Sequence, residues 1–240
     1  MSVRITRSRW KHGLLTALVA LCGAAPTALA AEPAAPLPDA VASWAHPNAV
    51  GPIRRFPNPG SAVIARVHLD TEGGSPEVYP ILGRFTDVAG RAWTRIGIPM
   101  RPNGRKGWVR DEVLGPVNRS DMLLIVDRTS LRATLRSGSR VVWSSRIGVG
   151  AAATPTPAGR FWIREKLRVT FGGSYGPRAF GTSAYSVLTD WPGGGVIGIH
   201  GTDQPSLIPG RPSHRCIRLQ NAAVTRLFEL MPIGTRVEIR

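Results

Sequence analysis

The sequence predicts a mainly β protein, in which a small β-barrel domain precedes a larger β-rich domain with one short helix near the C-terminus. Three observations lead to this fold class. Short runs rich in β-branched and aromatic residues recur along the chain, and many alternate apolar with polar positions. Turn sequences such as Asp-Val-Ala-Gly, Pro-Asn-Gly and Ser-Gly separate these runs. The best helix candidate, "NAAVTRLFELM" at 221–231, has apolar residues at helical spacing.

The first thirty residues have the layout of a secretory signal peptide. Basic residues precede an apolar run at 14–25, and a small-residue pattern at 28–30 marks a cleavage site. The run is shorter than the roughly 20 residues that a membrane span needs. An uncleaved anchor is the alternative, whereas Leu21 before Cys22 speaks against a lipoprotein. We therefore expect an exported protein of the periplasm or cell wall, with no membrane span once 1–30 is removed.

The part that follows the signal is expected to contain a linker and the first domain. Residues 31–45 are rich in Pro and Ala, as linkers are, and 46–117 is expected to form the small β-barrel. Strands are expected in "AVIARVHL" at 62–69 and on both sides of the Asp-Val-Ala-Gly turn in 78–98. A further short strand after the Pro-Asn-Gly turn is expected to end at Val109.

The second domain is expected to span 118–240. Three strands are expected within 122–150, and the proline turn of "TPTPAGRFWI" leads into another strand. The Gly-rich stretch at 171–195 has little periodicity and is expected to be a long functional loop. "VIGIHG" at 196–201 is expected to be a short buried strand, and "GTRVEIR" at 234–240 a closing one.

The candidate helix has a cap and an apolar stripe. Asn221 stands where a capping side chain is expected. The predicted apolar stripe comprises Ala223, Leu227 and Leu230.

The charge of the chain is strongly positive, with Lys+Arg 31 against Asp+Glu 15. The net charge of +16 falls to +12 once the four basic residues of the signal are removed. Arg is spread through the chain without a dense basic run, and export makes nucleic acid an unsuitable partner. We expect the charge to favour anionic cell-envelope polymers instead.

Removal of the signal leaves one cysteine, Cys216. A single cysteine cannot form an internal disulfide, so it is an intermolecular partner, a buried spectator or a reactive thiol. A reactive thiol needs a neighbouring base or positive charge, because the thiolate is the nucleophile. The segment "HGTDQPSLIPGRPSHRCIRL" supplies His200 at the end of a predicted strand and His214 two residues before the cysteine.

The segment between the two histidines contains prolines and a glycine, which suit a loop that returns His200 to Cys216. If 213–219 is a strand, His214, Cys216 and Arg218 share one face, and Arg215 lies on the other.

Two other sites are open alternatives. A zinc site would use four ligands, although no HExxH or CxxC pattern is present: His200, Asp203, His214 and Cys216. A serine nucleophile at Ser213 would lack the usual G-x-S-x-G elbow.

The segment "HGTDQPSLIPGRPSHRCIRLQNAA" resembles the signature of the L,D-transpeptidase (YkuD) family. "TPTPAGRFWI", "YGPRAFGTSAYS" and "IGIHGT" resemble the same family, and the likeness spans about 120–240. The first domain, with "RPNGRKGWV" near its end, resembles bacterial Src-homology-3-like domains more weakly.

The family resemblance implies a β-rich cysteine enzyme that acts on peptidoglycan stem peptides and needs no metal or organic cofactor. Cys216 would be the nucleophile and His200 the general base. The carbonyl of Gly201 or Thr202 would orient His200, and backbone N–H groups at 214–216 would form the oxyanion hole. The remaining implied roles are site-shaping for Ser213, His214 and Arg215, and substrate binding for Arg218 and Tyr175.

The implied reaction is a 3→3 cross-link between stem peptides through a thioester. The alternatives are an L,D-carboxypeptidase, in which water resolves the thioester, and a non-catalytic wall-binding protein that uses the first domain.

One residue departs from the family pattern. The family usually has glycine immediately before the cysteine, where this chain has Arg215. If that position needs a positive φ, a side chain there costs roughly 1 kcal/mol or more. We therefore expect Arg215→Gly to preserve or raise activity.

Overall fold

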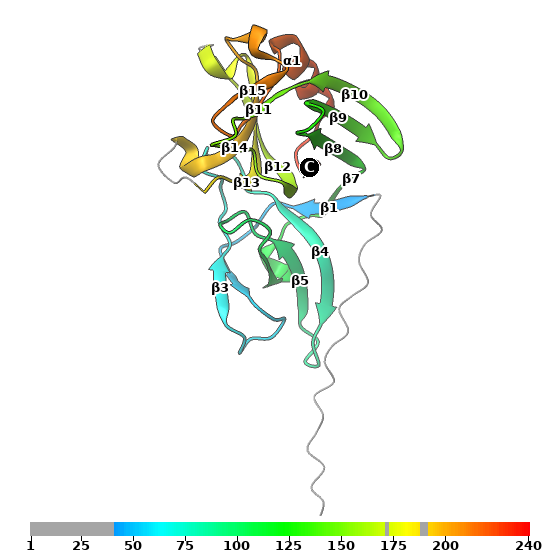
Figure 1. The fold of residues 1–240 in the computed structure, drawn as a ribbon. Helices are drawn as coiled ribbons and strands as arrows, with labels where there is room; N and C mark the ends of the chain where they lie inside the picture. Colours follow the sequence, from blue (N-terminus) through cyan, green and yellow to red (C-terminus); the bar gives the residue numbers. More distant parts are fainter. Residues whose placement is uncertain (1–40, 171–172, 188–191) are drawn as a thin grey trace, which may run out of the picture. The chain divides into compact units, whose positions relative to one another are not determined.

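The computed structural model describes residues 41–170, 173–187 and 192–240 (Figure 1). The predicted signal at 1–30 and the first ten residues of the predicted linker lie outside the described residues. The mainly β prediction is confirmed, since the described part has seventeen strands and one α-helix.

The first sheet has seven strands in the order β3-β2-β6-β5-β4-β1-β7. The two end strands are not paired with each other among the described residues, so a closed barrel stays a prediction. The strands predicted at 62–69, in 78–98 and before Val109 are all present. The strand bounds are β1 (Ala42–Ala45), β2 (Pro52–Arg54), β3 (Val63–Arg66), β4 (Tyr79–Thr86), β5 (Ala92–Gly97), β6 (Lys106–Arg110) and β7 (Asn118–Ser120), and a 3₁₀ turn, η1 (Asp111–Val113), follows β6.

Both ends of the first sheet differ from the sequence prediction. Residues 42–45, predicted as linker, form β1, which pairs with β4 and β7. Trp44 gives the physical reason: its ring packs against Gly234 so closely that a Cβ there would clash with the indole. Residues 118–120, expected in the second domain, form β7 of the first sheet. The change of sheet therefore lies between β7 and β8.

The second sheet has ten strands in the order β10-β9-β8-β17-β12-β13-β14-β16-β11-β15. The closing strand β17 lies between β8 and β12 and pairs in parallel with β8. The bounds are β8 (Met122–Asp127), β9 (Arg132–Ser137), β10 (Arg140–Arg146), β11 (Gly148–Gly150), β12 (Gly159–Arg168), β13 (Arg178–Tyr185), β14 (Val196–His200), β15 (Gly210–Ser213), β16 (Ile217–Arg218) and β17 (Arg236–Ile239). Three short 3₁₀ turns join them: η2 (Gly173–Tyr175), η3 (Pro192–Gly195) and η4 (Pro205–Leu207).

The predicted helix is present as α1 (Asn221–Leu230), and it contacts β13. Its cap is Gln220, so Asn221 is the first helical residue and its side chain is free for another role. The fully buried residues are Val224 and Leu227, and Ala223 and Leu230 of the predicted stripe are partly buried at its edges.

The prediction of a long loop at 171–195 is wrong, because β13 lies within it. β13 is a central strand between β12 and β14, and seven of its eight residues are buried. A strand covered on both faces has no alternation of apolar and polar residues. Its glycine, alanine, serine and threonine residues therefore gave no strand signal.

Candidate active site

The pairing of two short strands brings the predicted histidine and cysteine together. β14 and β16 run in parallel, with Ile199 opposite Ile217 and His200 opposite Arg218. The N–H of Gly198 donates a hydrogen bond to Cys216 Sγ at 3.4 Å. A Cβ added to Gly198 would lie 3.6 Å from His200 Cδ2 and 3.7 Å from Cys216 Sγ. The imidazole and the thiol therefore border the same small space over Gly198.

The prediction of a continuous strand over 213–219 is wrong. β15 ends at Ser213 and β16 begins at Ile217, and a bend at 214–216 lies between them. Arg215 has a φ of 112° in this bend, the backbone region that favours glycine. Before the bend, β15 pairs in parallel with β11, and after the bend, β16 pairs with β11 antiparallel. The bend therefore reverses the chain direction, and Cys216 lies within it.

His200 is held as a neutral base. Its side chain is 4% exposed, and its Nδ1 donates a 2.6 Å hydrogen bond to the carbonyl of Gly201. Burial lowers the pKa of His200 to about 4, opposed by the Gly201 hydrogen bond and assisted by the positive charge of Arg218. Because Nδ1 carries the proton, Nε2 has a free lone pair at neutral pH.

Cys216 is held as a neutral thiol. Burial raises the pKa of Cys216, while the hydrogen bond from Gly198 and the charge of Arg218 act in the opposite direction. A neutral thiol beside a neutral imidazole must lose its proton as it attacks. This arrangement therefore suits general-base catalysis rather than a preformed thiolate–imidazolium pair.

The two predicted substrate-binding residues lie next to this pair. The Tyr175 ring is 4.6 Å from the His200 ring and is 40% exposed. The Arg218 Nη1 donates a long, 3.5 Å hydrogen bond to Gln204, and its Nε is buried without a partner. None of the ion pairs between described residues involves Arg218. Its charge is thus available to a bound anion.

The other predicted site residues differ in their exposure to solvent. Thr202 and Ser213 are buried, whereas His214 is exposed. The four side chains of the alternative zinc site do not gather: the described part of the chain holds no group of three or more His, Cys, Asp or Glu side chains that could bind a metal ion.

Two residues of the site were missed by sequence reasoning. Asn221 accepts a hydrogen bond from the Thr202 N–H and thereby holds the chain after His200. The Thr156 hydroxyl donates a 2.6 Å hydrogen bond to the carbonyl of Arg215 and accepts one from the N–H of Gly150. The "TPTP" sequence marked this segment as rigid, but only the fold places it under the bend.

Known proteins match the part of the chain that carries this site. The family described as "YkuD: L,D-transpeptidase catalytic domain" matches residues 121–239. The YqjB protein of Bacillus subtilis is 30% identical over 130 residues, which cover 50% of this chain and 71% of that protein. The chain belongs to the L,D-transpeptidase (YkuD) family. The family resemblance predicted from the sequence is thereby confirmed.

Other members of the L,D-transpeptidase family match this chain over a smaller fraction of their own length. The YkuD protein of Bacillus subtilis is 36% identical over 106 residues, 44% of this chain and 58% of that protein. YkuD of Bacillus licheniformis is 36% identical over 54% of its length, so the chain spans little more than half of these relatives. A solved L,D-transpeptidase of Enterococcus faecium has 25% identity and a TM-score of 0.40 over 50% of this chain and 49% of that chain.

In this L,D-transpeptidase domain, the described residues contain no helix that is long and apolar enough to cross a membrane. The predicted export rests on residues 1–30, which the structure does not describe.

Gly198 gives a prediction about the space between His200 and Cys216. In Gly198→Ala the new Cβ meets both groups at ordinary contact distances, so the fold should persist. The methyl group would occupy room that an acyl group on Sγ needs. We expect turnover to fall on the order of tenfold to a hundredfold with an unchanged melting temperature. Turnover equal to that of the wild type would contradict this picture of the site.

The acid limb of the pH profile gives a second prediction. His200 acts as a base only when neutral, and its pKa is about 4 instead of the ordinary value of 6.5. Activity should therefore be retained as the pH falls through 6 and be half lost near pH 4. The pH dependence of kcat/KM, which reports groups of the free enzyme, measures this. An acid limb centred near pH 6.5 would mean that burial does not hold His200 neutral.

Proposed function

We propose that the chain is an exported peptidoglycan L,D-transpeptidase that forms 3→3 cross-links between stem peptides. The single observation that carries the proposal is the pairing of a buried, neutral His200 with the Cys216 thiol over Gly198. Family membership and the signal-like residues 1–30 support the substrate class and the location. No metal or organic cofactor enters the reaction.

In the first half-reaction the Cys216 Sγ attacks the carbonyl carbon that joins the third stem residue to the terminal D-Ala. The thiol proton passes to His200 Nε2, and a tetrahedral oxyanion forms. As the C–N bond breaks, His200 returns the proton to the leaving amine. D-Ala departs, and the stem remains as a thioester on Cys216.

In the second half-reaction a side-chain amine of a neighbouring stem attacks the thioester carbonyl. His200 accepts the proton that the amine loses and returns it to the departing sulfur. The product is an amide between two stems, and the thiol is regenerated. If water takes the place of the amine, the same steps give an L,D-carboxypeptidase.

The bend at 214–216 supports an oxyanion hole at Cys216. Thr156 binds the carbonyl of Arg215, and that carbonyl and the N–H of Cys216 belong to one trans peptide. The two groups point in opposite directions, so Thr156 directs the Cys216 N–H away from itself. A fixed N–H at the nucleophile is the type of donor that stabilises a developing oxyanion.

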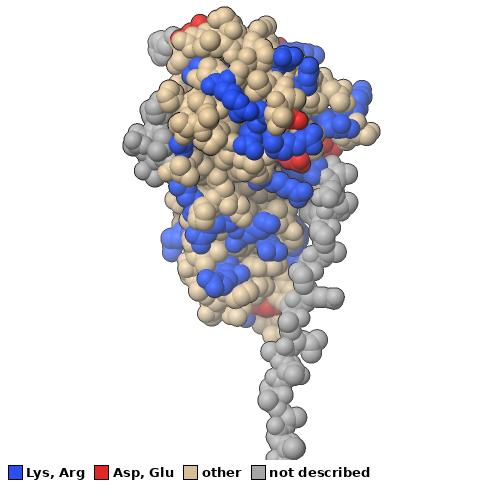
Figure 2. Space-filling view, in the orientation of Figure 1, with Lys and Arg blue, Asp and Glu red and all other residues tan. Residues whose placement is uncertain are grey.

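Charge favours anionic partners for the protein. Arg218 beside the thiol suits a carboxylate of the stem peptide. Figure 2 shows many Lys and Arg side chains and few Asp and Glu on the visible face. A surface of this kind favours contact with anionic cell-envelope polymers.

The product of purified tetrapeptide stems, read by mass spectrometry, tests the proposal against its alternatives. We expect cross-linked dimers and released D-Ala. Tripeptide without dimer would indicate the L,D-carboxypeptidase. Unchanged peptide, bound or unbound, would favour the non-catalytic wall-binding protein and overturn the proposal.

A further inference from the structure

A loop of the first sheet is hydrogen-bonded to both ends of the connection between β13 and β14. Arg101 lies in the loop between β5 and β6. Its Nε donates to the carbonyl of Ser186 at 2.7 Å, and its Nη2 donates to the carbonyl of Gly194 at 2.6 Å. Its guanidinium also lies 4.9 Å from the centre of the Tyr185 ring. One side chain thus fixes the end of β13 and the approach to β14.

A neighbouring residue of the same loop pairs with the β13 backbone. Asn103 Nδ2 donates to the carbonyl of Tyr185, and Asn103 Oδ1 accepts from the Tyr185 N–H, both at 2.9 Å. The amide side chain therefore continues the hydrogen bonding of the sheet across Tyr185. Arg101 and Asn103 together hold residues 185 and 186 by backbone and ring contacts.

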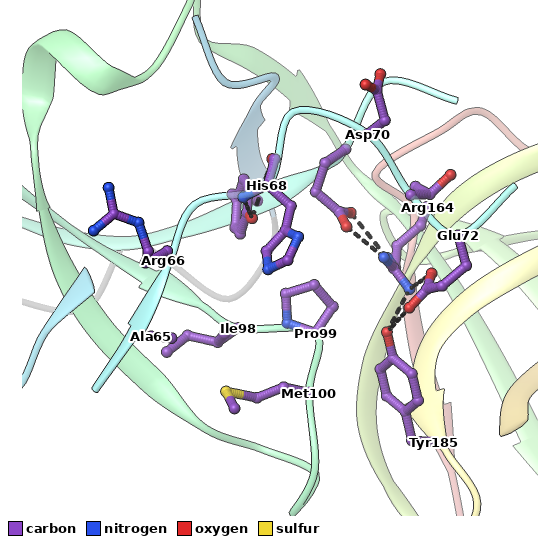
Figure 3. Close-up of a pocket in the computed structure, with 13 residues that line it drawn as sticks. Ala65, Arg66, His68, Asp70, Glu72, Ile98, Pro99, Met100, Arg164 and Tyr185 are labelled. Atoms are coloured by element: carbon purple, nitrogen blue, oxygen red, sulfur yellow. Dashed lines mark hydrogen bonds and ion pairs between the residues drawn. The ribbon is translucent and has the colours of Figure 1, made fainter. Parts of the chain in front are cut away.

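The Tyr185 hydroxyl contacts Glu72, in the connection between β3 and β4 of the first sheet, and Arg164. Figure 3 shows this hydroxyl directed toward Glu72 and Arg164, beside a cavity of about 270 Å³. Arg164 of β12 donates to the Tyr185 hydroxyl at 3.1 Å, and its Nε donates to Glu77 at 2.8 Å. A buried charge network of this kind loses much of its stability when one partner is removed. The first sheet is therefore a firm support for the end of β13.

The held residue, Ser186, in turn holds the residue that precedes Cys216. Arg215 Nη1 donates a 2.5 Å hydrogen bond to Ser186 Oγ. The Arg215 carbonyl is held separately by Thr156. The bend that carries Cys216 is thus fixed at its backbone by Thr156 and at its side chain by Ser186.

The Arg215 arrangement is costly for stability, which argues that it serves the site. Its φ is 112°, it is only 7% exposed, and its Nε is buried without a partner. No ion pair between the described residues compensates its charge. Strained and uncompensated groups persist mainly where they support function. The guanidinium of Arg215 is bonded to Ser186, which supports a positioning role for this residue.

We propose that Arg101 is a positioning residue of the Cys216 site, which acts by holding Ser186 so that Ser186 can hold Arg215 and the bend at 214–216. The first sheet is then part of the active-site scaffold, and its role is more than that of a separate wall-binding module. This inference rests on the proposed acyl-transfer function, because the bend matters through the Cys216 N–H that faces the oxyanion.

The test compares Arg101→Ala with a matched control, Arg84→Ala, in the full chain. Arg84 lies exposed on β4 of the same sheet, so its loss removes the same charge without touching β13. Two reactions of Cys216 are measured: acylation by a carbapenem, which passes through an oxyanion, and alkylation by iodoacetamide, which does not. Amide hydrogen exchange of the peptide over 214–219 is measured in parallel.

We expect Arg101→Ala to slow acylation about tenfold while the alkylation rate changes less than about twofold. The pH midpoint of alkylation should stay the same. Exchange over 214–219 should become faster in Arg101→Ala, and Arg84→Ala should match the wild type in all three measurements. Arg101→Lys, which can still donate to one carbonyl, should recover part of the acylation rate. Unchanged exchange and acylation in Arg101→Ala, or an equal fall in acylation and alkylation, would overturn the inference.

Failure of the proposed acyl transfer would give a different result from failure of the positioning role of Arg101. A wild type that is alkylated but never acylated would refute the proposed acyl transfer. The exchange measurement would still decide whether Arg101 holds the bend. Wild-type exchange over 214–219 in Arg101→Ala would refute the positioning role by itself.

Variants of Arg215, which is hydrogen-bonded to Ser186, extend the same test. Arg215→Ala removes the guanidinium and keeps a Cβ at the strained φ, whereas Arg215→Gly removes the guanidinium and relieves the strain. We expect both variants to slow acylation, whereas the sequence alone predicts preserved or raised activity for Arg215→Gly. Because Arg101 and Arg215 act through Ser186, the double variant with Arg101→Ala should lose little more than either single variant. Additive losses, or faster acylation in Arg215→Gly, would contradict the link.

Discussion

Replacing Cys216 with alanine is expected to abolish turnover of tetrapeptide stems. Cys216 is the only thiol in 31–240, and its Sγ borders the space over Gly198 that it shares with His200. The substitution removes one sulfur atom from a partly buried position, so we expect the free energy of unfolding to change by about 1 kcal/mol or less. Turnover assays and thermal melts of the same preparation measure the two effects.

The serine variant serves as the matched control for Cys216→Ala. Cys216→Ser keeps the size of the side chain and replaces the thiol by a much weaker nucleophile, so it should also lose turnover. Iodoacetamide should label the wild-type protein without 1–30 once and neither variant. Retained activity in Cys216→Ala would show that the nucleophile is assigned to the wrong residue.

The second large effect is expected for His200→Ala. Loss of a general base typically lowers the rate by about 10²- to 10⁴-fold. His200 is the buried imidazole whose Nδ1 is held by Gly201 and whose Nε2 is free. His200→Ala should therefore reduce kcat within that range and leave substrate binding less affected. Rates of stem-peptide turnover at neutral pH measure it.

His214 provides the comparison for His200. It is exposed and lies at the start of the bend at 214–216. His214→Asn should lower turnover much less than His200→Ala. Comparable losses in both variants, together with bound zinc found by elemental analysis, would favour the metal site over the cysteine enzyme.

Most strands were predictable because one of their faces is exposed. β4 alternates buried with partly exposed residues, and the Asp-Val-Ala-Gly turn joins it to β5, as the sequence predicted. β13 was not predictable by the same argument, since burial on both faces removes the alternation. β1 was hidden in a Pro/Ala-rich segment, where Trp44 was the one sign of packing.

The core of the site was also predictable, because its chemistry lies in one short segment. Cys216 and His200 were identified from their residue types and spacing, and the fold places them over Gly198. The bend at 214–216 was missed, because a positive φ at an arginine has no signature in a single sequence.

The supporting contacts could not be read from the sequence, because each joins distant parts of the chain. Thr156 lies 59 residues from Arg215, and Arg101 lies 85 residues from Ser186. Periodicity reports which face of an element is buried, and it contains no information about which loops meet. The same limit explains why Arg215 looked in the sequence only like a costly departure from the family glycine. In the structure its guanidinium is bonded to Ser186.

The most direct test of the central claim is intact-protein mass spectrometry of the wild type mixed with a tetrapeptide stem whose side-chain amine is acetylated, so that it cannot act as the acceptor. The account predicts a covalent adduct whose mass equals the tetrapeptide less D-Ala, located on the peptide that contains Cys216. The adduct should be absent in Cys216→Ala and should disappear when an acceptor stem is added. An adduct on another residue would contradict the account. So would cross-linking in the presence of the acceptor by a protein that forms no adduct at Cys216 in its absence.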